Sequence, residues 1–244
     1  MIIKKKAISF KFPNLILIKK IVISFLFLIL VLIVLNLDFI KIKILKMNLS
    51  FSPSESFFEN AIDVKIHSPI KNAEIYYTLD GSEPSANSFK YQNDQIIPIE
   101  KNTVIRAGIF KNKQKYTEPI SKSYFISFDS SLPIISIITD PKNLWDEKIG
   151  IYVLGNNLEK ANYSQRGDDW LRSANFTYFD KQQEIISRSI EFKIAGGASA
   201  YLPQKSLNLY FNNSTSNNAV NFNFFKQTKT TIFDSLRLRN SGND

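Results

Sequence analysis

A short run of small residues near the C-terminal end of the chain carries its clearest chemical signal. Gly196 and Gly197 are followed by Ala198 and Ser199, and Lys205 comes soon afterwards. Paired glycines let backbone amides approach an anion closely, and a nearby lysine adds a point charge suited to phosphate. The spacing of a P-loop is absent, and a hairpin bend at the glycines is the structural alternative. The run therefore predicts a candidate anion-binding loop.

A second polar group follows farther along the chain. Leucine and arginine alternate over residues 236–239, and this alternation predicts a half-buried strand. Asn240 begins a polar elbow that extends to Asp244, with side chains that form turns and can contact metal or phosphate. From these residues alone, we expect the elbow to lie on the lip of a functional site.

Several other kinds of catalytic site are excluded by residue type. The chain has no cysteine and one histidine, His67, so disulfides, thiolate sites, multi-histidine metal sites and a Ser-His-Asp triad are ruled out. The adjacent carboxylates Asp168 and Asp169 lie in a polar loop and are expected to be solvated. We expect no catalytic residue and no metal site within the chain.

The net charge of +9 is concentrated at the N-terminus. Residues 1–47 hold nine lysines and one acid, whereas the remaining 197 residues hold 22 basic and 21 acidic groups. The body therefore lacks the positive surface that binds a phosphate backbone, and we expect no nucleic-acid partner.

Residues 21–37 are uncharged and almost entirely Leu, Ile, Val or Phe. Such a helix would be roughly 25 Å long, near the lower limit for spanning a bilayer core. Lysines are more numerous before it than after it, which predicts a cytoplasmic basic tail over 1–20, a single-pass transmembrane signal anchor over 21–37 and an extracytoplasmic body. The alternative is a cleaved signal peptide, but no small-residue cleavage site follows. Residues 38–51 are expected to be a juxtamembrane linker.

Residues 52–128 predict an Ig-like antiparallel β-sandwich. Strands are expected over 62–66, 74–78, 96–99, 103–110 and 123–128, because these segments alternate or are β-branched and are bounded by turn residues. The segment Tyr-Tyr-Thr-Leu-Asp-Gly-Ser-Glu-Pro-Ser over 76–85, with the strands after it, resembles the β-sandwich found at the C-termini of chitobiases and β-hexosaminidases and in fucosidase-type glycoside hydrolases. The resemblance implies a non-catalytic accessory or spacer domain. Asp80 and Glu83 could be read as paired carboxylates for glycoside hydrolysis, but their spacing favours a turn.

Residues 132–244 predict a second, β-rich module after a short linker. Strands are expected over 134–139, 150–153, 174–179, 190–195, 206–211 and 235–239, with a turn or short helix starting at Asp140 and Pro141. This module resembles the CotH family, the spore coat protein H kinases. The motifs that carry the resemblance begin at Leu132, Asn143, Gly150, Asn162, Trp170, Gly196, Pro203 and Leu236.

The CotH resemblance implies a partial α+β kinase-like fold that uses ATP and a divalent metal, here Mg, to phosphorylate protein hydroxyls. By that resemblance Gly196, Gly197, Ser199, Lys205, Arg239, Asn240 and Asp244 bind nucleotide. The chain departs from the family where Ala200 and Tyr201 replace an arginine. The family's metal-binding and catalytic aspartates also lie beyond the Asn-Asp elbow, so no functional ATP or metal chemistry is expected in this chain.

The chain is therefore expected to be mainly β: a membrane anchor, an Ig-like sandwich and a truncated CotH-type domain over 132–244. The leading hypothesis is a membrane-anchored, extracytoplasmic CotH-like protein, truncated before its catalytic aspartates and inactive. The alternatives are a surface carbohydrate- or cell-wall-associated binding protein and a spacer without ligand. The membrane is the expected partner, with a surface protein or polysaccharide as a second one.

Overall fold

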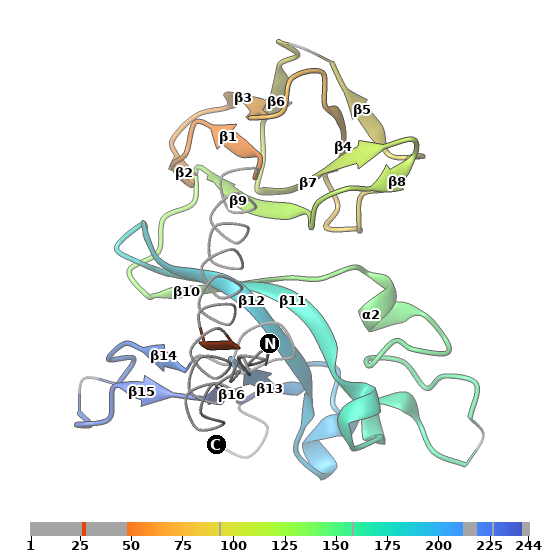
Figure 1. Cartoon of the computed structure of the whole chain (residues 1–244). Helices are drawn as coiled ribbons and strands as arrows, with labels where there is room; N and C mark the ends of the chain where they lie inside the picture. Colours follow the sequence, from red (N-terminus) through yellow and green to blue (C-terminus); the bar gives the residue numbers. More distant parts are fainter. Residues whose placement is uncertain are drawn as a thin grey trace, which may run out of the picture. The chain divides into compact units, whose positions relative to one another are not determined.

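The computed structural model describes residues 26–27, 48–92, 94–157, 159–211, 219–225 and 227–240. Residues 49–244 form one compact unit, in which two β modules follow each other along the chain (Figure 1). The predicted mainly β class is confirmed: in the described part, strands dominate and α2 (Lys142–Trp145) is a single short helix.

The basic tail over 1–20 lies outside the described residues, as do most of the predicted anchor and linker. Leu26 and Phe27 are the described residues of segment 21–37, and both are helical. A search of the described residues finds no helix with the length and apolar character needed to cross a bilayer.

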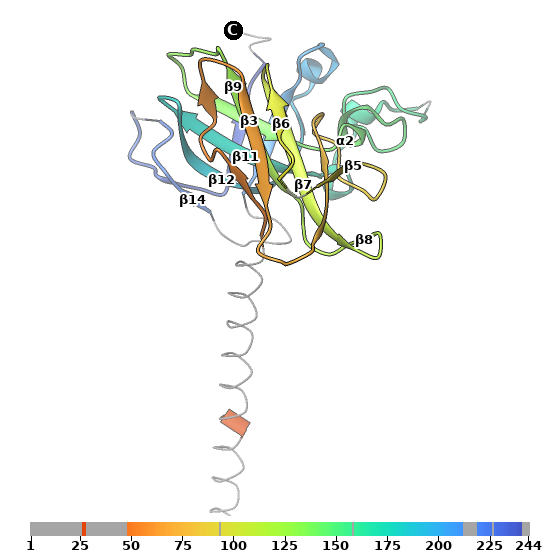
Figure 2. The ribbon, with the colours of Figure 1, turned by 90° about the horizontal axis from the view of Figure 1, so that it is seen from above.

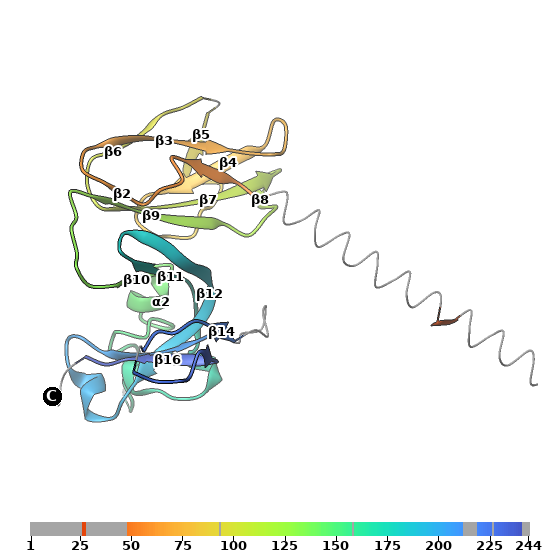
Figure 3. The same cartoon turned by 90° about the vertical axis from the view of Figure 1, so that its left-hand side faces the viewer.

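The first module consists of two facing sheets (Figure 3). One sheet has the order β1 (Ser50–Ser52), β3 (Ile62–His67) and β6 (Ile97–Ile99), whose last two strands run side by side in Figure 2. The other has the order β2 (Phe57–Phe58), β9 (Ile120–Ile126), β7 (Thr103–Lys111), β4 (Glu74–Thr78) and β5 (Phe89–Tyr91), and β8 (Gln114–Lys115) pairs with β7. The pairing is antiparallel except between β2 and β9.

Alternate residues of these strands form the sandwich core. In β7, Ile105, Ala107 and Ile109 lie in the core, as the period-two pattern requires. Tyr124 of β9 is fully buried, its hydroxyl donates to the carbonyl of Pro53 at 2.8 Å, and burial raises its pKa. The strands predicted over 62–66, 74–78 and 103–110 are confirmed.

The second module is built on one five-stranded antiparallel sheet. Its order is β10 (Ile134–Ile138), β11 (Arg172–Asp180), β12 (Gln183–Ala195), β13 (Ser206–Tyr210) and β16 (Ser235–Leu238). A separate ribbon joins β14 (Val220–Asn221) to β15 (Ile232–Phe233). Three short 3₁₀ turns complete the described part: η1 (Asn162–Ser164), η2 (Asp168–Trp170) and η3 (Ala198–Tyr201).

The two faces of this sheet differ in polarity. Phe176, Phe192 and Leu209 are fully buried on one face, in the core of the module. On the other face Lys193, Asn208 and Arg237 lie opposite one another across β12, β13 and β16. Lys193 and Arg237 therefore lie on the face of the sheet opposite to this core.

Two predictions about this module need correction. The strand predicted over 150–153 is wrong: the amides of Ile151 and Tyr152 donate to Asn143 and Leu144 carbonyls, so this segment folds back on α2 as a turn. The strand predicted over 190–195 is too short, because β12 begins at Gln183 and pairs with β11 as a hairpin. Lys181 and Gln182 form its turn with positive φ angles of 49° and 61°, a conformation more typical of Asn and Gly.

The modules meet along a seam between β9 of the sandwich and β10–β12 of the second sheet. Phe57 and Phe125 of the sandwich stack on each other, and both meet the ring of Phe179 edge-on. Three polar contacts continue the seam: Ser121 Oγ to Asn175 Oδ1 (3.1 Å), Lys122 Nζ to Glu184 Oε2 (2.9 Å) and Ser123 Oγ to Ser136 Oγ (2.8 Å).

Candidate functional site

The C-terminal ends of β12 and β16 and the start of β13 surround a pocket of about 450 Å³, here called the glycine-loop pocket. It contains five of the seven residues predicted as the anion site. None of the described residues that line it is acidic. The lining residues are Gly196, Gly197, Ala198, Ser199, Ser206, Arg237, Arg239 and Asn240.

Glycine is favoured at position 196 mainly by its backbone conformation, because the one atom that a Cβ would crowd belongs to a hydroxyl that can rotate. Gly196 has a φ of +87°, and a Cβ there would lie 2.1 Å from Ser199 Oγ. At Gly197, by contrast, a Cβ would meet no atom within 4 Å, so this residue leaves the wall of the pocket open. The Gly-Gly step therefore turns the chain tightly at its first residue and exposes backbone at its second.

Asn240 ties the end of β16 to the loop that follows β12. Its Nδ2 donates to the carbonyls of Gln204 at 2.7 Å and Ser199 at 3.4 Å. Ser206 Oγ donates to Asn240 Oδ1 at 3.1 Å, and the Asn240 amide donates to the same hydroxyl at 3.2 Å. The two halves of the predicted site are thus joined by hydrogen bonds across a long separation in sequence.

Lys205 lies at a different place from the one expected for a phosphate ligand. Its side chain is buried and does not line the pocket. The ammonium donates to the carbonyls of Ala200 at 2.7 Å and Leu202 at 3.0 Å, and it lies 4.2 Å from the centre of the Tyr163 ring. Burial lowers the pKa of Lys205.

Arginine supplies the cationic side chains of the pocket. Arg237 and Arg239 follow the alternation of β16 on the side opposite to Leu236, and Arg237 Nε donates to Asn208 Oδ1 at 2.8 Å. Arg237 was not singled out from the sequence, although the Leu-Arg-Leu-Arg pattern placed it on the same face as Arg239. Asp244, the remaining predicted residue, lies outside the described part of the chain.

The donor set of the pocket fits a phosphate group. Guanidinium groups, hydroxyls and backbone amides are the groups that bind phosphate in proteins. The described lining residues do not fit a divalent metal, because Mg²⁺ takes carboxylate ligands and these residues have none. Among the residues that the structure describes, no cluster of three His, Cys, Asp or Glu side chains could hold a metal ion.

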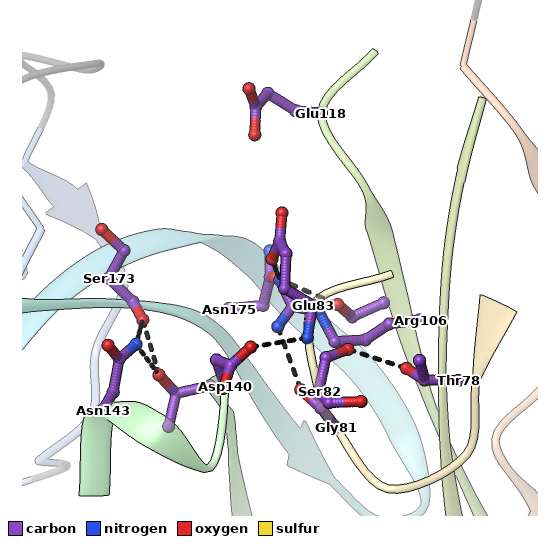
Figure 4. Close-up of polar contacts among 12 residues, drawn as sticks. Thr78, Gly81, Ser82, Glu83, Arg106, Glu118, Asp140, Asn143, Ser173 and Asn175 are labelled. Atoms are coloured by element: carbon purple, nitrogen blue, oxygen red, sulfur yellow. Dashed lines mark hydrogen bonds and ion pairs between the residues drawn. The ribbon is translucent and has the colours of Figure 1, made fainter. Parts of the chain in front are cut away.

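A second, larger cleft of about 470 Å³ opens at the edge of the seam (Figure 4). Glu83 and Arg106 form an ion pair there, and Lys115 lies 3.5 Å from the other oxygen of Glu83. Asp140 connects the modules: its Oδ2 accepts the Glu83 amide at 2.8 Å and its Oδ1 accepts the Lys142 amide at 2.9 Å. Glu83 and Asp140 are used in structural contacts, so we interpret this cleft as part of the contact between the modules.

The Asp80–Glu83 segment is confirmed as a turn. Asp80 Oδ1 accepts the amide of Ser82 at 2.9 Å and also its hydroxyl, and these bonds lower the pKa of Asp80. Thr78 Oγ1 donates to the Ser82 carbonyl at 2.7 Å, which closes the loop (Figure 4). Glu83 is turned toward Arg106, and the two carboxylates do not flank a common cleft, because Asp80 is not among the residues that line it.

Comparison with known families bears on the first module. Residues 53–122 match the family model of the chitobiase/beta-hexosaminidase C-terminal domain. The matched segment runs from the chain just before β2 into β9, so the predicted identity of the sandwich is supported. No curated protein and no solved structure matches the chain.

Proposed function

We propose that the second module is the nucleotide-binding part of a CotH-like, kinase-type domain in a membrane-anchored, extracytoplasmic protein. One observation carries the proposal: the sheet brings Gly196–Ser199 and Arg239–Asn240 together in a single pocket, and the described residues that line it include two arginines and no acid. Along the chain, the chitobiase-type sandwich follows the proposed anchor and precedes the nucleotide-binding sheet.

The electrostatics of the pocket support a polyphosphate ligand. Charge-assisted hydrogen bonds from guanidinium to phosphate are about twice as strong as neutral ones. Arg237 of β16 and Arg239 directly after this strand line the same pocket, so both can meet a single anion. Gly197 leaves room for the backbone to approach that anion.

We propose binding without phosphoryl transfer. Transfer depends on metal ions and carboxylates that hold them next to the phosphates. The described residues that line the pocket include no carboxylate, and the described part of the chain contains no cluster of three metal-ligating side chains. A role as a nucleotide-binding pseudokinase follows from this combination.

The test is equilibrium binding of ATP and of inorganic tripolyphosphate to the full-length chain in detergent. Replacing Arg237 and Arg239 together by glutamine should weaken binding of both ligands by at least about tenfold, because each lost charged hydrogen bond costs roughly 1.5–3 kcal/mol. Lys90→Gln removes an exposed cation of the sandwich and should change the Kd less than about twofold.

Absence of binding to the wild-type chain at millimolar ligand would refute the nucleotide proposal. If the arginine double variant binds with wild-type affinity, the ligand binds outside the glycine-loop pocket. Incorporation of phosphate from ATP into protein hydroxyls by this chain would contradict the proposed lack of transfer.

A surface glycan is the second candidate ligand, and an exposed ring on the sandwich favours it. Phe89 of β5 is 64% exposed and lines a depression of about 330 Å³ with Leu79, Asp80 and Asn87. Sugars bind where an aromatic face lies beside polar side chains. Pull-down on chitin, peptidoglycan and plant polysaccharides should retain the wild-type chain and release Phe89→Ala, with exposed Tyr116→Ala as the control. No retention on any of these would remove this candidate.

A further inference from the structure

We propose that Lys205 is a positioning residue that holds the loop 196–204 in shape, and that it is not a ligand of phosphate. The inference rests on the proposed function for the identity of the ligand. The positioning itself rests on contacts that exist without any ligand.

The ammonium of Lys205 is fully engaged inside the protein. An ammonium has three protons and no acceptor. Two of these protons are donated to the carbonyls of Ala200 and Leu202, and the ring of Tyr163 covers the group at 4.2 Å. The ring of Tyr152 lies on it as well, at 5.6 Å. To contact a phosphate, the Lys205 ammonium would have to break two hydrogen bonds and a cation–π contact.

Two further side chains, besides Lys205, donate hydrogen bonds to carbonyls of the loop. Arg166 Nη2 donates to the Gly196 carbonyl, where the loop begins. Asn240 Nδ2 donates to the carbonyls of Ser199 and Gln204. With Lys205 on the inner side, the loop carbonyls are bound by three side chains, and they come from three separate parts of the chain.

In this arrangement the lysine and the arginines have different roles. The lysine orders the loop before a ligand arrives, and the arginines of β16 face the pocket in which the ligand would bind. Preorganisation of this kind raises affinity because less conformational entropy is lost on binding.

The first test needs no ligand. Hydrogen–deuterium exchange of the amides over 197–204 should rise by about tenfold or more in Lys205→Met, which keeps the alkyl chain but removes the ammonium. Arg237→Gln should leave that exchange unchanged. If Lys205→Met fails to fold, Tyr163→Leu removes the covering ring and should give a smaller increase of the same sign. Unchanged exchange in both variants overturns the proposal.

The second test separates positioning from direct contact with the ligand. Lys205→Met should weaken ATP binding about tenfold while the salt dependence of the Kd stays that of the wild type, because no ligand contact has been lost. Arg237→Gln should weaken binding and also reduce the salt dependence. If Lys205→Met reduces the salt dependence of the Kd and leaves the hydrogen–deuterium exchange of the loop unchanged, then Lys205 contacts the ligand directly. If the wild type binds no phosphate compound, the proposed function fails and the exchange test still decides the positioning.

Discussion

Gly150→Ala is expected to lower the free energy of unfolding by about 3 kcal/mol or more. A Cβ at this position would lie 2.5 Å from the carbonyl oxygen of Asp146, 2.6 Å from its nitrogen and 2.7 Å from the carbonyl oxygen of Leu144. These atoms belong to the backbone of α2 and the turn after it, so they cannot rotate away as a side chain can. The turn must therefore open. Chemical denaturation of the full-length variant would measure the loss.

Gly108→Ala is the matched control. Gly108 is buried in β7, but a Cβ there would meet its nearest atoms at 3.4 and 3.5 Å, and its φ is not positive. We expect a change within about 1 kcal/mol, with a stabilising contribution from the less flexible unfolded chain. Equal unfolding energies for Gly150→Ala and the wild type would show that the turn at 146–150 is not formed as described.

The second large effect is expected at the cleft that opens at the edge of the seam. Arg106→Met should cost about 2–4 kcal/mol. Arg106 is 8% exposed, and its loss leaves the buried carbonyl of Gly81 without a donor and breaks the ion pair with Glu83. Glu83 is partly exposed, and water can solvate it, which keeps the cost below that of a fully buried pair.

Lys90→Met controls for the loss of a cation from an ion pair. Lys90 pairs with Glu74 at 3.2 Å, but both side chains are exposed, so we expect no measurable loss of stability. Similar losses in Lys90→Met and Arg106→Met, measured by urea unfolding, would show that Arg106 acts only as a surface charge.

Periodicity predicted the longer strands of both modules, because burial on one face forces alternation. The short strands β1, β2, β5 and β8 have too few residues to show a period. The hairpin between β11 and β12 was missed for a different reason: Lys181 and Gln182 adopt positive φ angles without being Asn or Gly. Tertiary pairing of the flanking strands dominates over turn preference there.

The glycine-loop pocket was predictable only in part. Gly196 and Asn240 have residue types that suit a tight turn and a polar cross-link, and both lie in the pocket. The position of Lys205 could not be predicted, because it depends on where Tyr163 and the Ala200 carbonyl lie in space. Asp140 was expected to begin a helix, and its second bond, to the Glu83 amide, depends on the contact between the modules.

The seam has a consequence for how this architecture can be rebuilt. Modules that are joined only by a linker can be exchanged for others, because they make no contacts with each other. The sandwich here contacts the second sheet along the seam. A replacement domain would have to present a serine to Ser136, a cation to Glu184 and aromatic rings to Phe179. We therefore expect a chimera that exchanges the sandwich alone to be less stable than one that moves both modules together.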